Sequence, residues 1–328
     1  MNRMNTILVT GGSGFIGSHF IKYLIKKQSN SEIFNLDALT YAGDRGRLDE
    51  LRDNRRYHFI KCDLRDKKRL SRTIKEIKPD IIFHFASETH VDNSINSPED
   101  FVDSNIVGTF NLLECIKERE VLLIHISTDE VYGDRRLDER LFSESNIFNP
   151  SSPYSATKAS QEMLIRAYAR TYNLRSITIR PCNNFGPFQN PEKFIPKCIL
   201  NAIENEPIPI YGNGKNLREW IYVEDTCEAI WKIFKKGKIG ESYNIGSGIF
   251  ISNLEMAKRI LKILNRTDDL ITFVPDRKGH DRAYGVDYSR LKRLGFERRT
   301  KLMDGLRVTI EWYSNNRDRF IKTTRGKR

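Results

Sequence analysis

A tyrosine and a lysine stand four residues apart at the start of a predicted helix, and their types and spacing suit proton transfer. Tyr154 and Lys158 share one face of that helix, which places the ammonium near the phenol oxygen. A cation in this position is expected to lower the pKa of the phenol and to make the tyrosinate a usable base. An ordinary exposed helix pair has the same spacing, so the pair needs support from its surroundings.

A run of polar residues follows the predicted strand over 122–127. Ser127, Thr128, Asp129 and Glu130 lie at the C-terminal end of that strand, where open α/β sheets place their ligands. The two adjacent carboxyl groups can take part in chemistry or simply solvate the end of the strand. Their combination with the tyrosine and the lysine favours chemistry.

The glycine-rich sequence T-G-G-S-G-F-I-G over residues 10–17 follows a predicted strand and opens a predicted helix. Gly11, Gly14 and Gly17 allow a tight turn and a close approach of the backbone to a pyrophosphate at the helix N-terminus. A purely structural turn uses the same residues. Asp37 lies 20 residues beyond Gly17, at the end of the second predicted strand, where a carboxylate receives ribose hydroxyls and repels a 2′-phosphate. This spacing favours a ribose-binding role for Asp37 over a loop or cap role. It also favours NAD over NADP.

The elements that must position these residues alternate along the first half of the chain. Short β-branched runs predict strands at 7–10, 33–36, 59–61, 81–83, 122–127 and 176–180, and amphipathic patterns predict helices at 16–27, 67–77, 101–117 and 154–172. This alternation predicts an α/β fold, a doubly wound Rossmann-type parallel sheet with helices on both faces. After Arg180 proline and glycine become frequent, which predicts a smaller C-terminal α/β substrate lobe. We therefore expect a cofactor-binding domain over 1–180, a partly interleaved substrate lobe over 181–328, and a frayed basic tail from about residue 315.

Composition narrows the class of protein. The chain has 328 residues and a formal net charge of +12, but its basic residues are scattered and accompany no nucleic-acid motif, which disfavours nucleic-acid binding. A cationic surface also attracts an anionic nucleotide. The five cysteines form no C-x-x-C pair, so neither a disulfide framework nor a metal site is indicated. No apolar stretch predicts export or a membrane span, and we expect a cytoplasmic protein.

Several motifs together resemble one enzyme family. G-G-S-G-F-I-G, S-T-D-E-V-Y-G, S-P-Y-S-A-T-K-A-S and R-P-C-N-N-F-G-P are similar to the extended short-chain dehydrogenases, and the adjacent Thr128, Asp129 and Glu130 resemble the dTDP-glucose 4,6-dehydratases among them. The resemblance continues through the segments 83–95, 211–223 and 276–281 to 305–313 and so covers nearly the whole chain. Sugar epimerases on this scaffold share the tyrosine and the lysine but lack the acid pair.

The resemblance implies a reaction in which a nucleotide-linked glucose is oxidised at C4 by bound NAD, loses water across C5 and C6, and regains the hydride at C6. Tyr154 would take the C4 hydroxyl proton, Thr128 would hold that oxygen, Glu130 would remove the C5 proton, and Asp129 would protonate the departing C6 hydroxyl. Lys158 would support Tyr154. One carboxyl group must be ionised and the other protonated, which suits neighbours with separated pKa values.

The resemblance also implies binding residues and a partner. NAD would be lined by Gly11, Gly14, Phe15, Ile16, Gly17, Asp37, Ala38, Leu39, Thr40, Asp63, Leu64, Ala86, Tyr154, Lys158 and Asn184. The nucleotide sugar would be bound by Glu88, Thr89, Thr128, Asn183, Lys193, Arg218, Asn244, Arg277 and His280. A homodimer would form through the helices near 101–117 and 154–172.

Four positions depart from the family pattern, and we expect them near cofactor or substrate. Asn93 stands for a usual arginine, Thr89 for a serine, Ser87 for an alanine and Thr226 for a common histidine. Three functions stay open: the dehydratase, a related epimerase or decarboxylase, and a non-catalytic NAD-binding or nucleic-acid-binding protein. The sequence does not separate dTDP-glucose from UDP-glucose or CDP-glucose.

Overall fold

Seven parallel strands form the main sheet of the protein, whose computed structural model describes residues 5–320. The spatial order is β10-β6-β5-β4-β1-β2-β3, and every neighbouring pair runs parallel. The strands are β1 (Asn5–Thr10), β2 (Ser31–Asp37), β3 (Tyr57–Lys61), β4 (Ile81–His84), β5 (Leu122–Ile126), β6 (Arg175–Pro181) and β10 (Ser242–Ile245). The order reverses between β1 and β4, and that reversal opens a crevice at the carboxyl ends of the strands. The predicted doubly wound sheet is confirmed.

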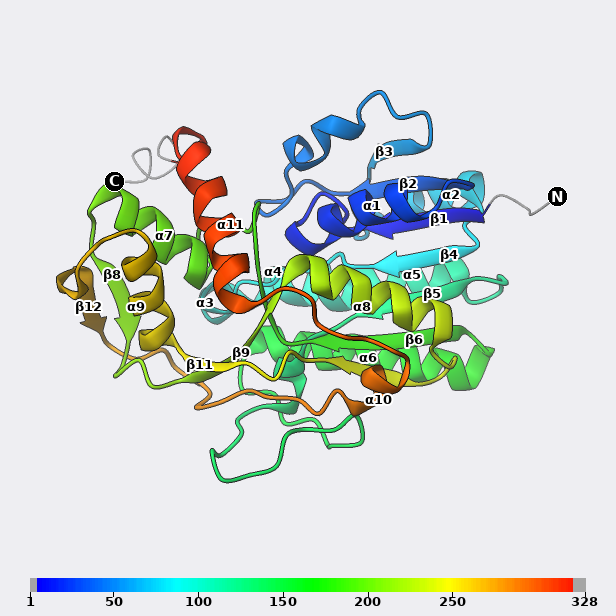
Figure 1. Cartoon of the computed structure of the whole chain (residues 1–328). Helices are drawn as coiled ribbons and strands as arrows, with labels where there is room; N and C mark the ends of the chain where they lie inside the picture. Colours follow the sequence, from blue (N-terminus) through cyan, green and yellow to red (C-terminus); the bar gives the residue numbers. More distant parts are fainter. Residues whose placement is uncertain (1–4, 321–328) are drawn as a thin grey trace.

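Both faces of this sheet are buried under helices (Figure 1). Successive residues of β1 point to opposite faces, so Ile7 and Val9 enter one hydrophobic cluster while Leu8 enters another. The first cluster lies under α1 (Phe15–Lys27) and α8 (Val223–Lys236). The second lies under α2 (Lys67–Ile77), α5 (Gly108–Ile116) and α6 (Pro153–Tyr172).

The helix predicted over 101–117 is a composite. A short helix α4 (Pro98–Phe101) passes into a π-helical turn η2 (Val102–Val107) and then into α5. Such turns are rare inside helices and are often found at functional sites. Here Asn105 in that turn points inward and holds the backbone amide of Glu88 through its Oδ1, at 2.8 Å. The other predicted helices agree with the structure to within one residue at each end.

The chain after residue 180 forms a smaller lobe and also returns to the main sheet. The lobe holds two small sheets, β11-β9-β7 and β12-β8. Three helices pack with these sheets around one hydrophobic cluster, which includes Trp220 and Met256. The elements of the lobe are β7 (Asn183–Phe185), α7 (Phe194–Glu204), β8 (Ile208–Tyr211), β9 (Leu217–Tyr222), β11 (Phe250–Ser252), α9 (Asn253–Ile263), β12 (Ile271–Val274) and α11 (Leu302–Asn315). Between them α8 packs on α1, and β10 pairs with β6.

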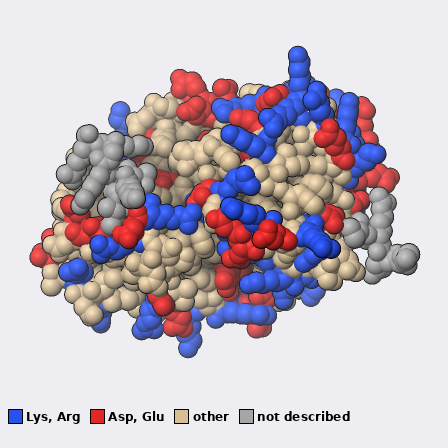
Figure 2. Space-filling view, turned by 90° about the horizontal axis from the view of Figure 1, so that it is seen from above, with Lys and Arg blue, Asp and Glu red and all other residues tan. Residues whose placement is uncertain are grey.

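The short remaining elements are η1 (Arg45–Leu51), α3 (Val91–Asn96), η3 (Asp129–Tyr132), η4 (Asp268–Leu270) and α10 (Ser289–Arg293). Residues 316–320, expected to fray, instead fold back: Arg319 bonds Asp44, and Phe320 packs on Trp312 and Tyr313. The rest of the predicted tail, 321–328, lies outside the described residues. Basic and acidic side chains are interspersed over the face shown in Figure 2. No helix within residues 5–320 is both long and apolar enough to span a membrane.

Candidate active site

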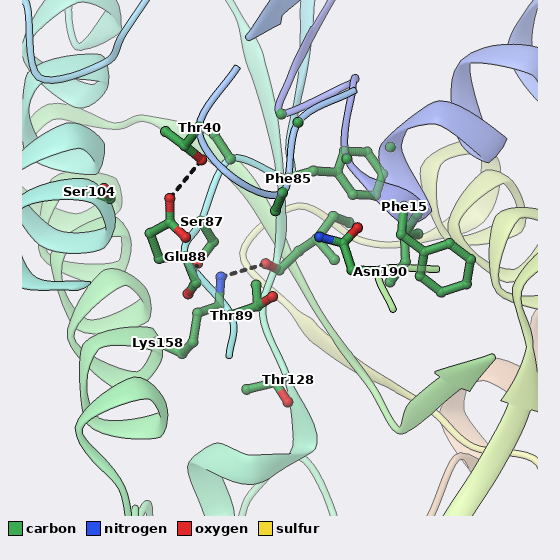
Figure 3. Close-up of a pocket in the computed structure, with 18 of the residues that line it drawn as sticks. Phe15, Thr40, Phe85, Ser87, Glu88, Thr89, Ser104, Thr128, Lys158 and Asn190 are labelled. Carbon is green, nitrogen blue, oxygen red and sulfur yellow. Dashed lines mark hydrogen bonds between the residues drawn. The ribbon is translucent and has the colours of Figure 1, made fainter. Parts of the chain in front are cut away.

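A cavity of about 290 Å³ opens where the strand order reverses, close to the volume typical of a small-molecule site. Figure 3 shows part of its lining, with Phe15 and Asn190 on one side and Glu88, Thr40 and Lys158 on the other. Among the residues expected to bind NAD, the cavity is lined by Gly11, Gly14, Phe15, Ile16, Gly17, Asp37, Ala38, Thr40, Asp63, Leu64, Ala86, Tyr154, Lys158 and Asn184. Leu39 is the exception: it does not line the cavity, and its N–H donates to Asp37 Oδ1 at 2.8 Å.

The glycine-rich turn at one end of this cavity fits a pyrophosphate. Gly11 has a φ of +70°, and a Cβ there would stand 2.6 Å from the backbone of Ala86, so only glycine fits. Helix α1 then begins at Phe15 with Gly14 as its N-cap, and no side chain of the described residues caps it. The first amides and the positive end of the helix therefore face the cavity, as an anion requires.

Asp37 is held rigidly at the wall of the same cavity. Its Oδ2 accepts the N–H of Ser13 at 2.9 Å, and its Oδ1 accepts the N–H of Leu39. Burial raises the pKa of Asp37, and these two hydrogen bonds oppose the rise. A fixed acceptor at the end of β2 fits the ribose hydroxyls of a dinucleotide, so the residues present fit NAD.

Tyr154 and Lys158 both line the cavity from the first turns of α6, and the structure corrects their expected coupling. Lys158 Nζ donates to the backbone oxygen of Ile126 at 2.9 Å, and burial lowers the pKa of Lys158 to about 7. The pKa of Tyr154 is raised by burial and next by the charge of Glu130, while a hydrogen bond from Thr128 opposes the rise. The expected net lowering of the Tyr154 pKa by Lys158 is therefore not found in the protein alone, because burial outweighs it and also lowers the pKa of the lysine.

The two carboxyl groups after β5 sit in different surroundings. Asp129 is buried, its Oδ2 has no hydrogen-bond partner within the described residues, and its pKa is raised well above the ordinary value by burial and next by Glu130. Burial also raises the pKa of Glu130, but the nearby Arg277, Lys193 and Arg218 oppose the rise. Both carboxyl groups therefore have raised pKa values, and Glu130 has more cations near it than Asp129 to stabilise its charge.

A second cavity joins the first at Glu130 and extends between α3 and the smaller lobe. Of the residues expected at the substrate, Thr89, Asn183, Lys193, Arg218, Arg277 and His280 line it. Thr128 and Glu88 line the first cavity instead, where Glu88 accepts the hydroxyl of Thr40 at 2.7 Å (Figure 3). Lys193 Nζ donates to the backbone oxygen of Thr89 at 2.7 Å, and Arg277 lies 3.6 Å from a carboxylate oxygen of Asp92. Three cations beside Glu130 suit a diphosphate.

Asn244 was assigned to the substrate wrongly. It is fully buried in β10, accepts the hydroxyl of Tyr132 at 2.8 Å, and donates to the backbone oxygens of Phe142 and Asp287. Asn253, the first residue of α9, lines the second cavity beside Asn183 and Asn184 and was not expected there. Its position after the helix cap Ser252 gives no sequence signal for a ligand. The cavity also contains residues that sequence reasoning missed: Asp92, Gln189, Glu192, Tyr211, Trp220 and Tyr284.

The four departures from the family pattern fall in different places. Ser87 lines the first cavity and Thr89 lines both, as expected. Asn93 is exposed on α3 and lines neither cavity. Thr226 is fully buried in α8, outside both cavities, so its expected place near a ligand is wrong. All five cysteines are free, and within residues 5–320 no group of three or more His, Cys, Asp or Glu side chains could hold a metal ion.

Known proteins resemble the chain along nearly its whole length. A family described as GDP-mannose 4,6 dehydratase matches residues 8–309. The low-salt glycan biosynthesis protein Agl12 of Haloferax volcanii is 44% identical over 94% of this chain and 98% of its own length. The dTDP-glucose 4,6-dehydratase of Neisseria meningitidis is 44% identical over 96% of this chain and 94% of its own length. The crystal structure of DesIV, a dTDP-glucose 4,6-dehydratase from Streptomyces venezuelae with NAD and TYD bound, superposes with a TM-score of 0.92 at 40% identity, covering 95% of this chain and 98% of that one.

Proposed function

Because the chain belongs to the nucleotide-sugar 4,6-dehydratases of the extended short-chain dehydrogenases, we propose that it dehydrates a nucleoside-diphosphate glucose, specifically dTDP-glucose, to the 4-keto-6-deoxy sugar nucleotide. The general activity, NAD-dependent dehydration of a nucleotide sugar, is that of the family. The proposal concerns which sugar and which nucleotide base the substrate carries.

The residues of the first cavity fit NAD. The uncapped start of α1 is placed for the pyrophosphate, and Asp37 for a ribose. When bound, NAD supplies the hydride acceptor for C4 and the hydride that returns to C6. The chain supplies binding, orientation and every proton transfer.

The two adjacent carboxyl groups of Asp129 and Glu130, which lie in unlike surroundings, are the observation that supports dehydration. Dehydration across C5 and C6 needs one group that takes a proton from carbon and one that gives a proton to the departing hydroxyl. We assign Asp129 as the acid, because its pKa is strongly raised and its buried Oδ2 has no hydrogen-bond partner within the described residues, and Glu130 beside three cations as the base. Tyr154 takes the proton of the C4 hydroxyl, and Thr128 holds that oxygen. C4 epimerisation and C4-initiated decarboxylation need no acid at C6, so Asp129 argues against both.

The choice of dTDP-glucose rests on relatives. The proteins from Neisseria meningitidis and Streptomyces venezuelae are both dTDP-glucose 4,6-dehydratases, at 44% and 40% identity. The second cavity supplies aromatic rings from Tyr211, Trp220 and Tyr284 beside the cations that suit a diphosphate. UDP-glucose and CDP-glucose share the same sugar and diphosphate, so they are the alternatives to test.

A homodimer and a cytoplasmic location belong to the same proposal. On the outer face of η2, α5 and α6, the large apolar side chains of Val102, Val107, Phe110 and Met163 are 39–50% exposed. An apolar face on two adjacent helices suits a four-helix seam between two copies. Five free thiols suit a reducing compartment.

Incubation of the purified protein with dTDP-, UDP-, CDP- and GDP-linked hexoses tests the function directly. Mass spectrometry should show loss of one water from dTDP-glucose, with no added oxidant, and slower loss or none from the others. An unchanged mass with all of them, or a C4 epimer in their place, would contradict the proposal.

A further inference from the structure

Arg47 is a buried arginine whose guanidinium joins three separate segments around the cofactor cavity. It lies in η1 and is only 6% exposed. Its Nη1 donates to the backbone oxygens of Ser13 at 2.7 Å and Ala42 at 2.6 Å, and its Nε donates to the backbone oxygen of Phe188 at 3.1 Å. Its Nη2 donates to the side-chain oxygen of Asn190. All four acceptors are neutral.

The first of these segments is the glycine-rich turn. Both peptide units that flank Ser13 are held by hydrogen bonds, because the Ser13 N–H donates to Asp37 and the Ser13 oxygen accepts from Arg47. The N–H of Asp44 donates to the same oxygen at 3.0 Å. Through Ala42 the arginine also holds the loop after β2, which lines the cavity at Ala42 and Gly43. Arg47 therefore fixes the two backbone segments that face a dinucleotide.

The third segment, 187–190, leads from the cofactor cavity into the substrate cavity. Asn190 lines the first cavity, and its backbone oxygen accepts the N–H of Lys193 at 3.1 Å. Lys193 lines both cavities and is among the cations that oppose the pKa rise of Glu130. Through Asn190, the guanidinium of Arg47 is thus connected to the turn that carries Lys193, which is proposed to bind the diphosphate.

No other side chain fits these acceptors as Arg47 does. A guanidinium presents five N–H groups in a fixed plane, and four bonds from three of its nitrogens are made here. Lysine has a single nitrogen and cannot reach acceptors on three segments. Since the four acceptors are neutral, these hydrogen bonds do not compensate the positive charge of Arg47 beside a site for an anion.

We propose that Arg47 is a positioning residue that clasps the glycine-rich turn, the loop after β2 and the segment 187–190 together, so that bound NAD is retained between turnovers and Lys193 is aligned for the substrate diphosphate. Only the second part of this proposal, the alignment of Lys193 for the substrate diphosphate, rests on the proposed function. Retention of NAD is independent of which sugar is dehydrated.

Exchange of bound NAD for isotopically labelled NAD, followed by mass spectrometry, tests the clasp. Arg47→Ala should release NAD about 10- to 100-fold faster than the unchanged protein, the range expected when charged hydrogen bonds are lost. Arg47→Lys should recover only a small part of the loss, and added guanidinium ion should slow the release from Arg47→Ala. Arg45→Ala is the matched control, because Arg45 is exposed on the same element and contacts the ring of Phe59.

The same variants separate positioning from simple destabilisation. Thermal unfolding is measured beside the exchange, and Arg47→Lys keeps the test open if Arg47→Ala does not fold. The KM for the nucleotide sugar should rise in Arg47→Lys by more than kcat falls. Equal NAD release from Arg47→Lys and Arg45→Ala would overturn the clasp. Slow NAD release from the unchanged protein without dehydration of any sugar would instead overturn the proposed function.

Discussion

Arg180 and Glu162 form an ion pair of 2.6 Å in which neither side chain is more than 2% exposed. Arg180 also donates to the hydroxyl of Tyr132 at 2.6 Å, and that hydroxyl donates to Asn244. The network joins β6, α6, η3 and β10. It therefore fixes the helix that carries Tyr154 and Lys158 against the turn that carries Asp129 and Glu130.

Glu162→Gln should lower the free energy of unfolding by about 3–5 kcal/mol, because it leaves a buried guanidinium without its counter-charge. Arg180→Met combined with Glu162→Leu should cost less than Glu162→Gln alone. Urea unfolding measures both. Glu255→Gln breaks the exposed pair with Arg259 and serves as the control, expected to cost at most about 0.5 kcal/mol. Equal losses in the buried and exposed pairs would contradict this account.

The same network contains a residue, Asn244, whose place in the fold could not be predicted from the sequence. Up to residue 181 the strands and most of the helices follow from local apolar patterns and agree closely with the prediction, whereas the elements of the smaller lobe were not predicted one by one. The glycine-rich turn and Asp37 follow from their spacing. Asn244 was misassigned because its partners, Tyr132 and Phe142, lie about a hundred residues away in sequence. Asn253 in the second cavity, and Arg47 behind the first cavity, carry no local pattern for the same reason.

The pKa values of the ionisable groups in the site could not be predicted from the sequence either. The four-residue spacing of Tyr154 and Lys158 is real, but the pKa of each depends on burial that only the packed sheet determines. The acid–base division of Asp129 and Glu130 stays a prediction, since burial raises the pKa of both and only the surrounding cations distinguish them.

Asp37 should decide the cofactor. We expect NAD to co-purify with the protein and NADP not to replace it. Asp37→Asn keeps the side-chain volume but removes the negative charge, so it should hold NAD about 10- to 100-fold more weakly and accept NADP better. Acid release and mass spectrometry identify the bound dinucleotide. Asp53→Asn, at an exposed position outside the cavity lining, is the control. NADP in the unchanged protein would show that Asp37 has another role.

The buried histidines His84 and His125 should make stability fall at acid pH. Burial, and next the charge of Lys158, lower the pKa of His84 to about 3 and that of His125 well below its ordinary value. The charge of Arg180 also disfavours protonation of His125. An unfolded histidine titrates near 6.5, so below that pH the unfolded chain binds protons that the folded protein does not. Stability is complete above about pH 6.5 and is lost as the pH falls through that value, by about 2 kcal/mol per histidine at pH 5.

His125→Leu tests this, because neither ring nitrogen of His125 has a hydrogen-bond partner in the described part of the chain. The variant should lose less stability than the unchanged protein between pH 7 and pH 5. His84→Leu should show the same weaker pH dependence but a lower stability at pH 7, since His84 bonds the hydroxyls of Thr10 and Thr109. Urea unfolding at several pH values measures both. An unaltered acid slope in His125→Leu would count against the assignment.

The apolar face of α5 and α6 should hold the homodimer together. Phe110→Glu places a charge in the middle of that face and should give a monomer by light scattering at micromolar protein. Leu137→Glu is the control, since Leu137 is 69% exposed in the loop after η3. A monomer mass for the unchanged protein would contradict the proposed seam.

The last prediction divides the catalytic roles among Tyr154, Asp129 and Glu130. Tyr154→Phe removes the base for the C4 hydroxyl, so it should slow the reaction roughly 10²- to 10⁴-fold, with no reduced nicotinamide detectable. Asp129→Asn keeps that base but removes the acid for the C6 hydroxyl. Reduced nicotinamide should therefore build up in a single turnover, seen by its near-ultraviolet absorbance, and the C5 proton should still exchange with heavy water. Glu130→Gln should give the same absorbance but suppress the exchange. If Asp129→Asn turned over normally, or if both carboxyl variants blocked C4 oxidation as fully as Tyr154→Phe, Asp129 and Glu130 would not be the acid and the base, and an epimerase-like reaction would explain the site better.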